Sequence, residues 1–259
     1  MDYKDSYQLG LYEKAMPAQL TWEERLAAAK EAGFDYIEMS IDETPEKISR
    51  LDWDIAQIEQ LRQAQERIGL TIDSICLSAQ RKYPLGSKKW ETEACELMQK
   101  AVRFARKMGL RYVMLQGYDC YYQETSDETS KLRFLKNIKE GVMYAASQGV
   151  MLAIETMEND FMNTVEKAMR VIRQVDSPYL LVYPDLGNIT NGTSDILTDI
   201  ESGQVNFPAG IAKFYGLGVR RYVAEFWHCG EDNWRQILAD NRRFLDEQFQ
   251  HAQELLSTY

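Results

Sequence analysis

Short runs of apolar residues alternate along the chain with longer segments in which apolar positions recur at helical spacing. The short runs predict β-strands, and the 3.6-residue period of the longer segments predicts amphipathic helices. Seven strands are predicted, at residues 8–12, 36–39, 72–77, 112–116, 151–155, 180–183 and 222–226. The main predicted helices span residues 21–32, 54–68, 88–108, 130–147, 165–174, 208–215 and 233–256.

The ends of these helices carry sequence signals of their own. Thr21, followed three residues later by Glu24, forms a capping box at the start of the first helix. Several helices end at a glycine, which adopts the left-handed conformation of a helix terminus without steric cost. The glycines in question are Gly33, Gly69, Gly109 and Gly149, and each leads within a few residues into the next strand. This repeated order predicts parallel strands with helices outside them.

The repeated unit predicts an α/β fold with a single barrel domain over residues 1–259. A TIM (β/α)8 barrel has about 250 residues, and the 259 residues here contain no linker that would separate two domains. The pattern nevertheless gives seven strands where a barrel has eight. After residues 184–188 we expect a loop and a short helical stretch at 195–201, and the next helix then begins near Pro208. Residues 204–207 are too short and polar for a strand, so the sequence predicts a barrel that lacks its seventh strand.

Charge and composition argue against two classes of partner. The chain has 30 basic and 40 acidic residues, a net charge of −10, whereas phosphate contacts of a nucleic-acid-binding protein require a basic surface. No apolar run reaches the 18 or so residues that span a bilayer, and the start lacks the basic-then-apolar pattern of a secretory signal. The four cysteines lie far apart, without a CxxC pair. We therefore expect a cytoplasmic protein with reduced thiols, no nucleic-acid partner and no membrane partner.

Polar side chains close most of the predicted strands, and active sites of α/β barrels lie at the carboxyl ends of the strands. These residues are Glu13, Glu38, Ser78, Gln116, Glu155, Asp185 and Glu225. The last three are carboxylates that each close an apolar strand, and carboxylates are costly to bury without a cation or a hydrogen-bonded partner. Their convergence on one mouth would indicate a divalent metal, Mn²⁺, Mg²⁺ or Zn²⁺. The alternative is that each is a separate, solvated strand end.

Two carboxylates beside a metal suit proton transfer next to a carbonyl group. The metal would hold the carbonyl and hydroxyl oxygens and stabilise an enediolate, while one carboxylate takes a proton and the other returns one. An aldolase would instead need a Schiff-base lysine at a strand end. Lys14 comes nearest to that position, but a lone lysine is more often solvated.

Other candidate binding residues lie in the loops that follow the strands. The loop after the third strand contains Ser78 and Arg81 and would hold an anionic substrate or stay a solvated basic loop. Tyr118 follows the fourth strand and would either line a polar pocket or pack its loop. Glu158 and Asn163 lie between the fifth strand and a helix whose first N–H groups suit a phosphate, although Asn163 or Thr164 fits an ordinary N-cap equally well.

Two further residues follow Glu225. Trp227 would line the mouth of the site or pack against the rim. His228 is close enough along the chain to approach the site, but a single loop histidine is more often incidental. The only other histidine, His251, is expected on the surface.

Several motifs, in the same order, resemble one family of sugar-phosphate epimerases, from about residue 8 to the end. They are LYEKA at 11–15, FDYIEMSIDE at 34–43, SRLDW at 49–53, CLSA at 76–79, GYD at 117–119, Glu155 with FMN at 161–163, YPDLGN at 183–188 and EFW at 225–227. The family is the L-ribulose-5-phosphate (L-xylulose-5-phosphate) 3-epimerases, also labelled hexulose-6-phosphate isomerases. The resemblance implies a xylose-isomerase-like barrel, a divalent metal and inversion at C3 of a ketopentose phosphate in L-ascorbate or related pentose catabolism. It also implies that Glu155 and Glu225 are the paired metal-binding acid/bases, that Asp185 is a further ligand, and that the protein is a homodimer.

The chain departs from this family at one place. Relatives have a seventh strand with a His-Leu-Lys type motif, whose histidine is a fourth metal ligand, and then a loop with an arginine near the substrate. Here Gly203 is followed directly by residues 204–207, so both motifs are missing, and Gln80 stands where the family tends to have histidine.

Three readings stay open: a 3-epimerase, an isomerase of another keto sugar or its phosphate, and a catalytically silent relative that binds a sugar phosphate. A metal-dependent DNA-repair endonuclease is dismissed, because it would need several histidines and a basic groove.

Overall fold

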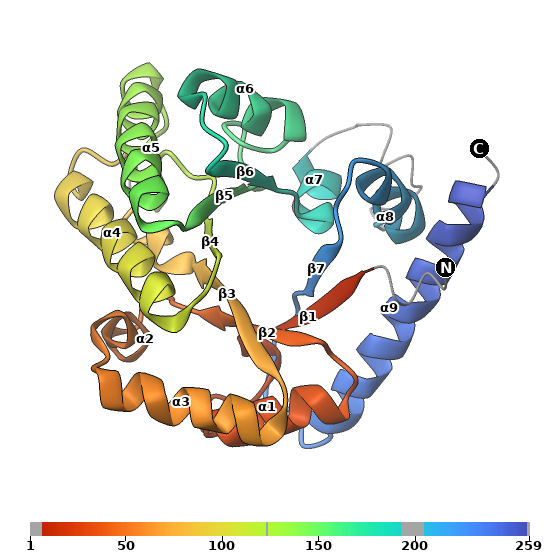
Figure 1. The fold of residues 1–259 in the computed structure, drawn as a ribbon. Coiled ribbons are helices and arrows are strands. Elements are labelled where there is room, and N and C mark those ends of the chain that lie inside the picture. Colours follow the sequence, from red (N-terminus) through yellow and green to blue (C-terminus); the bar gives the residue numbers. More distant parts are fainter. Residues whose placement is uncertain (1–6, 123, 193–204, 258–259) are drawn as a thin grey trace. The chain divides into compact units, whose positions relative to one another are not determined.

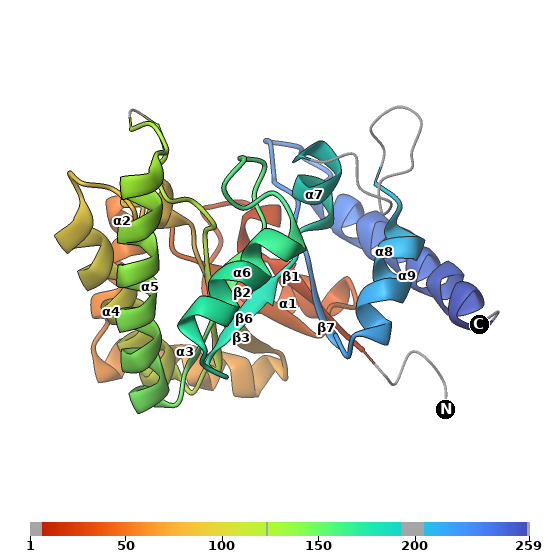
Figure 2. The same cartoon turned by 90° about the horizontal axis from the view of Figure 1, so that it is seen from above.

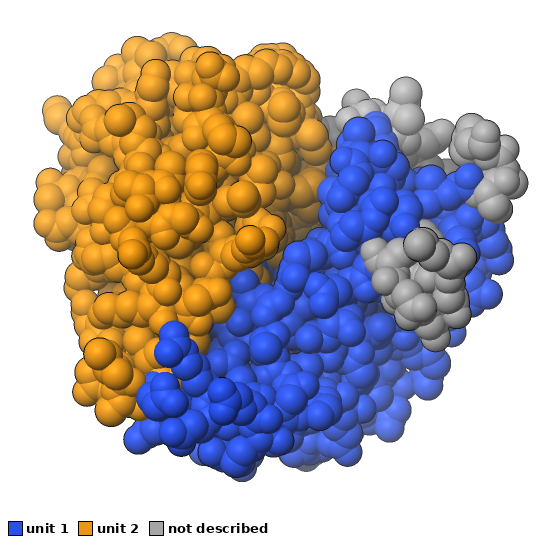
Figure 3. All heavy atoms as spheres, in the orientation of Figure 1, with its two compact units in different colours: residues 1–39, 59–73, 196–259 blue, residues 40–58, 74–195 orange. Residues whose placement is uncertain are grey.

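The computed structural model describes residues 7–122, 124–192 and 205–257 (Figure 1). The chain divides into two compact units, each built from more than one segment (Figure 3). Unit 1 comprises residues 1–39, 59–73 and 196–259, and unit 2 comprises residues 40–58 and 74–195. The interpretation as a single domain stays a prediction, and each unit is described by itself.

Unit 1 contains three parallel strands in the order β2–β1–β7. β1 (Gln8–Tyr12) pairs with β2 (Tyr36–Ser40, of which residue 40 belongs to unit 2) and with β7 (Arg221–Ala224). Its helices are the 3-10 helix η2 (Glu13–Ala15), α1 (Trp22–Glu31), α8 (Phe207–Gly216) and α9 (Trp234–Ser257), together with most of α3 (Ile55–Ile68). Figures 1 and 2 both show α8 lying beside α9.

The side of β1 that carries Gly10 lies against an aromatic ring of the neighbouring strand. A Cβ atom added at Gly10 would lie 2.2 Å from a carbon of the Tyr36 ring. This ring is held in place, because its hydroxyl donates a hydrogen bond to the Tyr222 carbonyl oxygen (2.8 Å) and the Arg221 guanidinium stacks on it at 4.6 Å. Glycine is therefore required here for packing.

We expect Gly10→Ala to lower the free energy of unfolding by about 1–3 kcal/mol, because the added methyl group overpacks this contact. Urea denaturation measures the effect. Gly216→Ala is the matched control, since a Cβ there meets no atom within 4 Å and alanine favours the helix. A Gly10→Ala protein as stable as the wild type would contradict the packing argument.

Unit 2 contains four parallel strands in chain order. They are β3 (Thr71–Leu77, whose first three residues belong to unit 1), β4 (Tyr112–Leu115), β5 (Met151–Glu155) and β6 (Leu180–Tyr183). Its helices are α2 (Pro45–Ser49), η3 (Arg50–Asp52), η4 (Ser78–Arg81), α4 (Glu91–Met108), α5 (Glu128–Gln148), α6 (Val165–Val175) and α7 (Leu186–Gly192). The long helices α4 and α5 lie side by side in both ribbon views (Figures 1 and 2).

The core of unit 2 forms where α4 and α5 pack on β4 and β5. Both faces of these strands are buried, as parallel strands between covering layers require, and Val113, Leu152 and Ile154 have no exposed surface. On the helix side, Phe104 of α4 is also fully buried and packs edge-to-face on Trp53 with ring centroids 5.9 Å apart. Gly109 and Gly149 end α4 and α5 with positive φ angles of 79° and 71°, as predicted.

The structure differs from the sequence expectations in four features. The loop expected after residues 184–188 is the helix α7, and α2 was not predicted. Glu38 was expected at a strand end but lies inside β2, where it is buried. β7 ends at Ala224, so Glu225 follows the strand instead of lying within it.

The strand count of seven agrees with the sequence, and a seventh strand is present as β7. The strand that the sequence predicts to be missing from the barrel would lie between β6 and β7. The described residues of that segment form the helices α7 and α8. The short helical stretch expected at 195–201 lies outside the described residues. Of the helices within the described part of the chain, none combines the length and apolarity needed to cross a membrane.

Candidate active site

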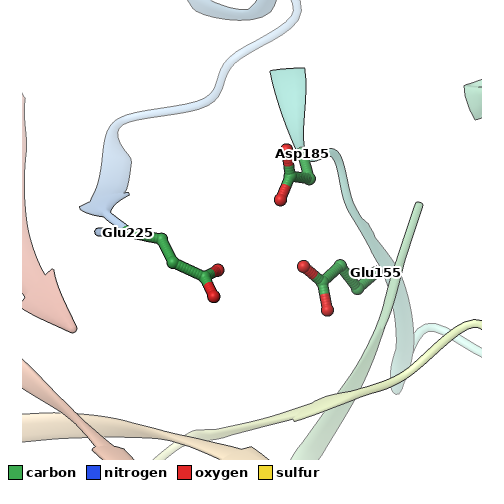
Figure 4. Close-up of side chains that lie close together, drawn as sticks. All are labelled: Glu155, Asp185 and Glu225. Atoms are coloured by element: carbon green, nitrogen blue, oxygen red, sulfur yellow. The ribbon is translucent and has the colours of Figure 1, made fainter. Parts of the chain in front are cut away.

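The three carboxylates singled out from the sequence lie at or just after the ends of three different strands. Glu155 is the last residue of β5, and Asp185 comes two residues after the end of β6. Both belong to unit 2, whereas Glu225 directly follows β7 in unit 1. Figure 4 draws all three side chains.

Glu155 and Asp185 bring two carboxylates together within unit 2. Their side chains point toward one another in Figure 4, and a carboxylate oxygen of each lies within 4.8 Å of the other. Glu155 is only 3% exposed, and Asp185 is half-buried. Two negative charges this close repel each other, and a bound cation would offset the repulsion.

Asp185 is held in place by the end of the neighbouring strand. Thr156, which follows Glu155 and is fully buried, accepts a hydrogen bond from the Asp185 backbone N–H through its hydroxyl (2.8 Å). The Asp185 carboxylate accepts from the backbone N–H of Asn188 (2.9 Å), in the manner of an N-cap of α7. The Asn188 amide in turn donates to the Thr156 carbonyl oxygen (3.1 Å). Thr156 and Asn188 were not predicted as site residues. The sequence did hold a signal for Asn188, because Asp185 stands three residues before it, as an N-cap residue does at the start of a helix.

Glu225 is exposed and lies next to residues of unit 1 that the sequence also singled out. The Trp227 indole N–H donates to the Glu225 carboxylate at 3.5 Å, and the Lys14 ammonium lies 4.5 Å from the centre of the Trp227 ring. The backbone N–H of His228 donates to the Lys14 carbonyl oxygen (2.8 Å). Lys14 and Trp227 thus lie next to Glu225, while His251 is exposed on α9, as expected.

The predicted loop after β3 lies beside Glu155. Ser78 is buried, and its hydroxyl has no hydrogen-bond partner among the described residues. Arg81 donates through Nε to the side-chain oxygen of Gln116 (3.4 Å), and Gln116 donates to the Glu155 carboxylate (2.8 Å). Arg81, the last residue of η4 and half-buried, is thus linked to Glu155 through Gln116.

Tyr118 and Glu158 form a second polar contact in unit 2. The buried Tyr118 hydroxyl donates to both carboxylate oxygens of Glu158, at 3.0 Å each. Burial, and then the charge of Glu158, raise the pKa of the Tyr118 hydroxyl above its usual range. Tyr118 therefore stays protonated and acts as a hydrogen-bond donor at any physiological pH.

Thr164 and Asn163, at the start of α6, have different hydrogen-bond partners. Thr164 is the N-cap, and its hydroxyl accepts from the backbone N–H of Lys167. The buried Asn163 side chain accepts instead from the Lys167 ammonium (2.7 Å). Lys167 was not predicted as a site residue. Its position in the first turn of a helix whose start suits a phosphate would have been a signal for it in the sequence.

The donor set fits a divalent metal ion. Carboxylate oxygens are the ligands that Mg²⁺ and Mn²⁺ prefer, and Zn²⁺ also accepts them. Within unit 2, the structure places a carboxylate oxygen of Glu155 within 4.8 Å of a carboxylate oxygen of Asp185. No disulfide joins the four cysteines, all of which are among the described residues.

Comparisons with known proteins show the family of the chain. The family described as xylose isomerase-like TIM barrel matches residues 26–243. The chain is 43% identical over 197 residues to L-ribulose-5-phosphate 3-epimerase UlaE of Salmonella heidelberg (strain SL476), which covers 75% of this chain and 69% of the relative.

Two solved structures are similar in fold. One is an L-ribulose 3-epimerase, with a TM-score of 0.78 and 16% identity, covering 97% of both chains. The other is a xylose isomerase-like TIM barrel protein from Mycobacterium smegmatis in complex with magnesium, with a TM-score of 0.71 and 17% identity, covering 97% of this chain and 99% of that one. At this identity the likeness shows the barrel fold, and the magnesium belongs to that protein.

Proposed function

We propose that this chain, which belongs to the L-ribulose-5-phosphate 3-epimerase family of xylose isomerase-like TIM barrels, inverts C3 of a ketopentose 5-phosphate with a divalent metal. As a member it is an isomerase-class enzyme. The substrates we propose are L-ribulose 5-phosphate and L-xylulose 5-phosphate, with the reaction serving L-ascorbate or related pentose catabolism. The expected cytoplasmic location and the homodimer are part of the same proposal.

The observation that carries the proposal is the buried Glu155 carboxylate beside Asp185 at the ends of two neighbouring parallel strands. Placing a second carboxylate beside a buried one is unfavourable unless a cation or a proton binds between them. A relative that is 43% identical and named L-ribulose-5-phosphate 3-epimerase supports the same chemistry.

Glu155 and Glu225 are the paired acid/bases of this proposal. Inversion at a carbon next to a carbonyl removes the proton from one face and returns it to the other, so it needs two proton-transferring groups. Glu155, Asp185 and Glu225 would also hold the metal, which when bound supplies Lewis-acid polarisation of the substrate oxygens. Glutamates transfer protons at the carboxylate oxygens, and burial keeps water away from Glu155.

We assign substrate contacts to the polar residues that flank these carboxylates. They are Lys14, Ser78, Arg81, Tyr118, Glu158, Asn163 and Trp227. The buried Ser78 hydroxyl supports the assignment because a buried polar group normally has a partner. The cations Lys14 and Arg81 suit an anionic substrate.

The direct test is exchange of the C3 proton of L-ribulose 5-phosphate in heavy water, followed by proton NMR together with the appearance of the C3 epimer. We expect deuterium at C3 and formation of L-xylulose 5-phosphate. Exchange with another keto sugar alone would favour the second reading, an isomerase of different specificity. Binding without any exchange would favour a catalytically silent relative, the reading that the missing histidine motif supports.

Removal of divalent metal by EDTA is expected to abolish the exchange, and Mn²⁺ to restore it. The physical reason is that the carboxylates lose the cation that offsets their repulsion, and the substrate oxygens lose their polarising group. Saturation with Mn²⁺ at about 100 times its dissociation constant would also stabilise the fold by about 2.7 kcal/mol. Full activity after exhaustive chelation would contradict the metal requirement.

A further inference from the structure

Gln116, the residue after β4, connects three side chains of unit 2. It is 3% exposed, and its side-chain amide has a partner at each end. The nitrogen Nε2 donates to Oε2 of Glu155 at 2.8 Å, and the oxygen Oε1 accepts from Nε of Arg81 at 3.4 Å. The amide thus lies between a permanent cation and a carboxylate.

These two partners fix the orientation of the amide. A guanidinium group has donors only, and an ionised carboxylate has acceptors only. Turning the Gln116 amide over would place its nitrogen against Arg81 and its oxygen against Glu155, and both hydrogen bonds would be lost. The order Arg81 to Gln116 to Glu155 is therefore the single hydrogen-bonded arrangement of these three groups.

The backbone of Gln116 is held as firmly as its side chain. Its N–H donates to the side-chain oxygen of Gln80 at 2.9 Å, and Gln80 is 1% exposed. The next residue, Gly117, allows close approach to β5, because a Cβ there would lie 2.3 Å from the Glu155 carbonyl oxygen. Gln116 therefore cannot move away from Glu155 without breaking buried contacts.

We propose that Gln116 is a positioning residue that fixes the direction of the Glu155 carboxylate, with Arg81 and Gln80 holding Gln116 in turn. By binding Oε2, the amide sets the rotation of the carboxylate group and so the direction of Oε1. The proposal rests on the proposed function, in which Glu155 binds metal and transfers a proton. Hydrogen bonds to a ligating carboxylate are worth about 10–100-fold in metal affinity or activity.

The test replaces Gln116 by methionine, which has a similar volume and no amide, and by asparagine, which is one methylene shorter. Gln148→Met is the matched control, since Gln148 also accepts from an arginine (Arg106, 2.9 Å) and donates to a neighbour (Ser147, 3.1 Å), but at the surface. Three measurements are made on each protein: the Mn²⁺ dissociation constant by calorimetry, kcat and KM separately, and the Glu155 conformer in metal-free crystals.

We expect both Gln116 variants to bind Mn²⁺ about 10–100-fold more weakly and to lose kcat with little change in KM, while Gln148→Met stays like the wild type. The Glu155 side chain should leave its wild-type conformer in both. Wild-type Mn²⁺ affinity and an unchanged Glu155 conformer in these variants would overturn the proposal. If Gln116→Met does not fold, the same measurements on Gln116→Asn decide between the two outcomes. A wild type without Mn²⁺ binding or turnover overturns the proposed function instead, and the Glu155 conformer then decides the positioning role alone.

Discussion

Glu155→Gln is expected to reduce the rate of C3 inversion by about 10²–10⁴-fold, the usual contribution of a general acid or base. Glutamine keeps the shape of the side chain but neither takes up nor releases the proton. The fold should persist, because the substitution removes the repulsion between Glu155 and Asp185. Deuterium exchange at C3 measures the rate, and thermal unfolding monitors the fold.

The control for this result is Glu166→Gln on α6. Glu166 is exposed and pairs with Arg173 (3.0 Å), so its loss changes the same kind of charge away from the proposed site. Its activity should stay near the wild-type value. Turnover of Glu155→Gln close to that of the wild type would contradict the paired-carboxylate mechanism.

Phe104→Ala is expected to lower the free energy of unfolding by about 3–5 kcal/mol, among the largest effects of a single core substitution. The side chain has no exposed surface and packs on Trp53, so its removal leaves a cavity in unit 2 and loses the contact between the rings. Chemical denaturation of the purified variant measures the change.

Leu132→Ala gives the matched comparison within unit 2. Leu132 lies on α5 and is 66% exposed, so a large apolar side chain is lost without a cavity. We expect a change of no more than about 0.5 kcal/mol. Equal destabilisation by both substitutions would show that Phe104 is not the packing centre of α4.

The strands could be predicted closely from the sequence because their signal is local. Apolar runs of four to seven residues, bounded by turn residues, gave β1, β5 and β6 with the bounds that the structure has. The helix α7 was missed because Leu186–Gly192 contains two glycines and two asparagines, which are poor helix formers. Its start depends on Asp185, whose carboxylate was interpreted only as a metal ligand.

The charged residues of the candidate site could be predicted from the sequence, but the residues that hold them in place by hydrogen bonds could not. Carboxylates after apolar strands are visible in a sequence because they break a hydrophobic pattern. The roles of Thr156 and Gln116 are not visible there, since they depend on hydrogen bonds that exist only once neighbouring strands are in register. The paired register of β4 with β5, and of β5 with β6, brings those residues to Glu155 and Asp185.

The pairing of β1 with β7 has a consequence for how the chain folds during synthesis. In unit 2 each strand pairs with its neighbour in the chain, so most contacts close short loops. In unit 1, Gln8 and Arg221 meet across 213 residues, and the loop-closure entropy of so distant a contact slows its formation. A ribosome has synthesised all of unit 2 before β7 emerges, so unit 2 is expected to fold first. Until β7 is synthesised, the edge of β1 that pairs with β7 has no partner strand. We expect this nascent state to be the one most prone to aggregation and most dependent on chaperones.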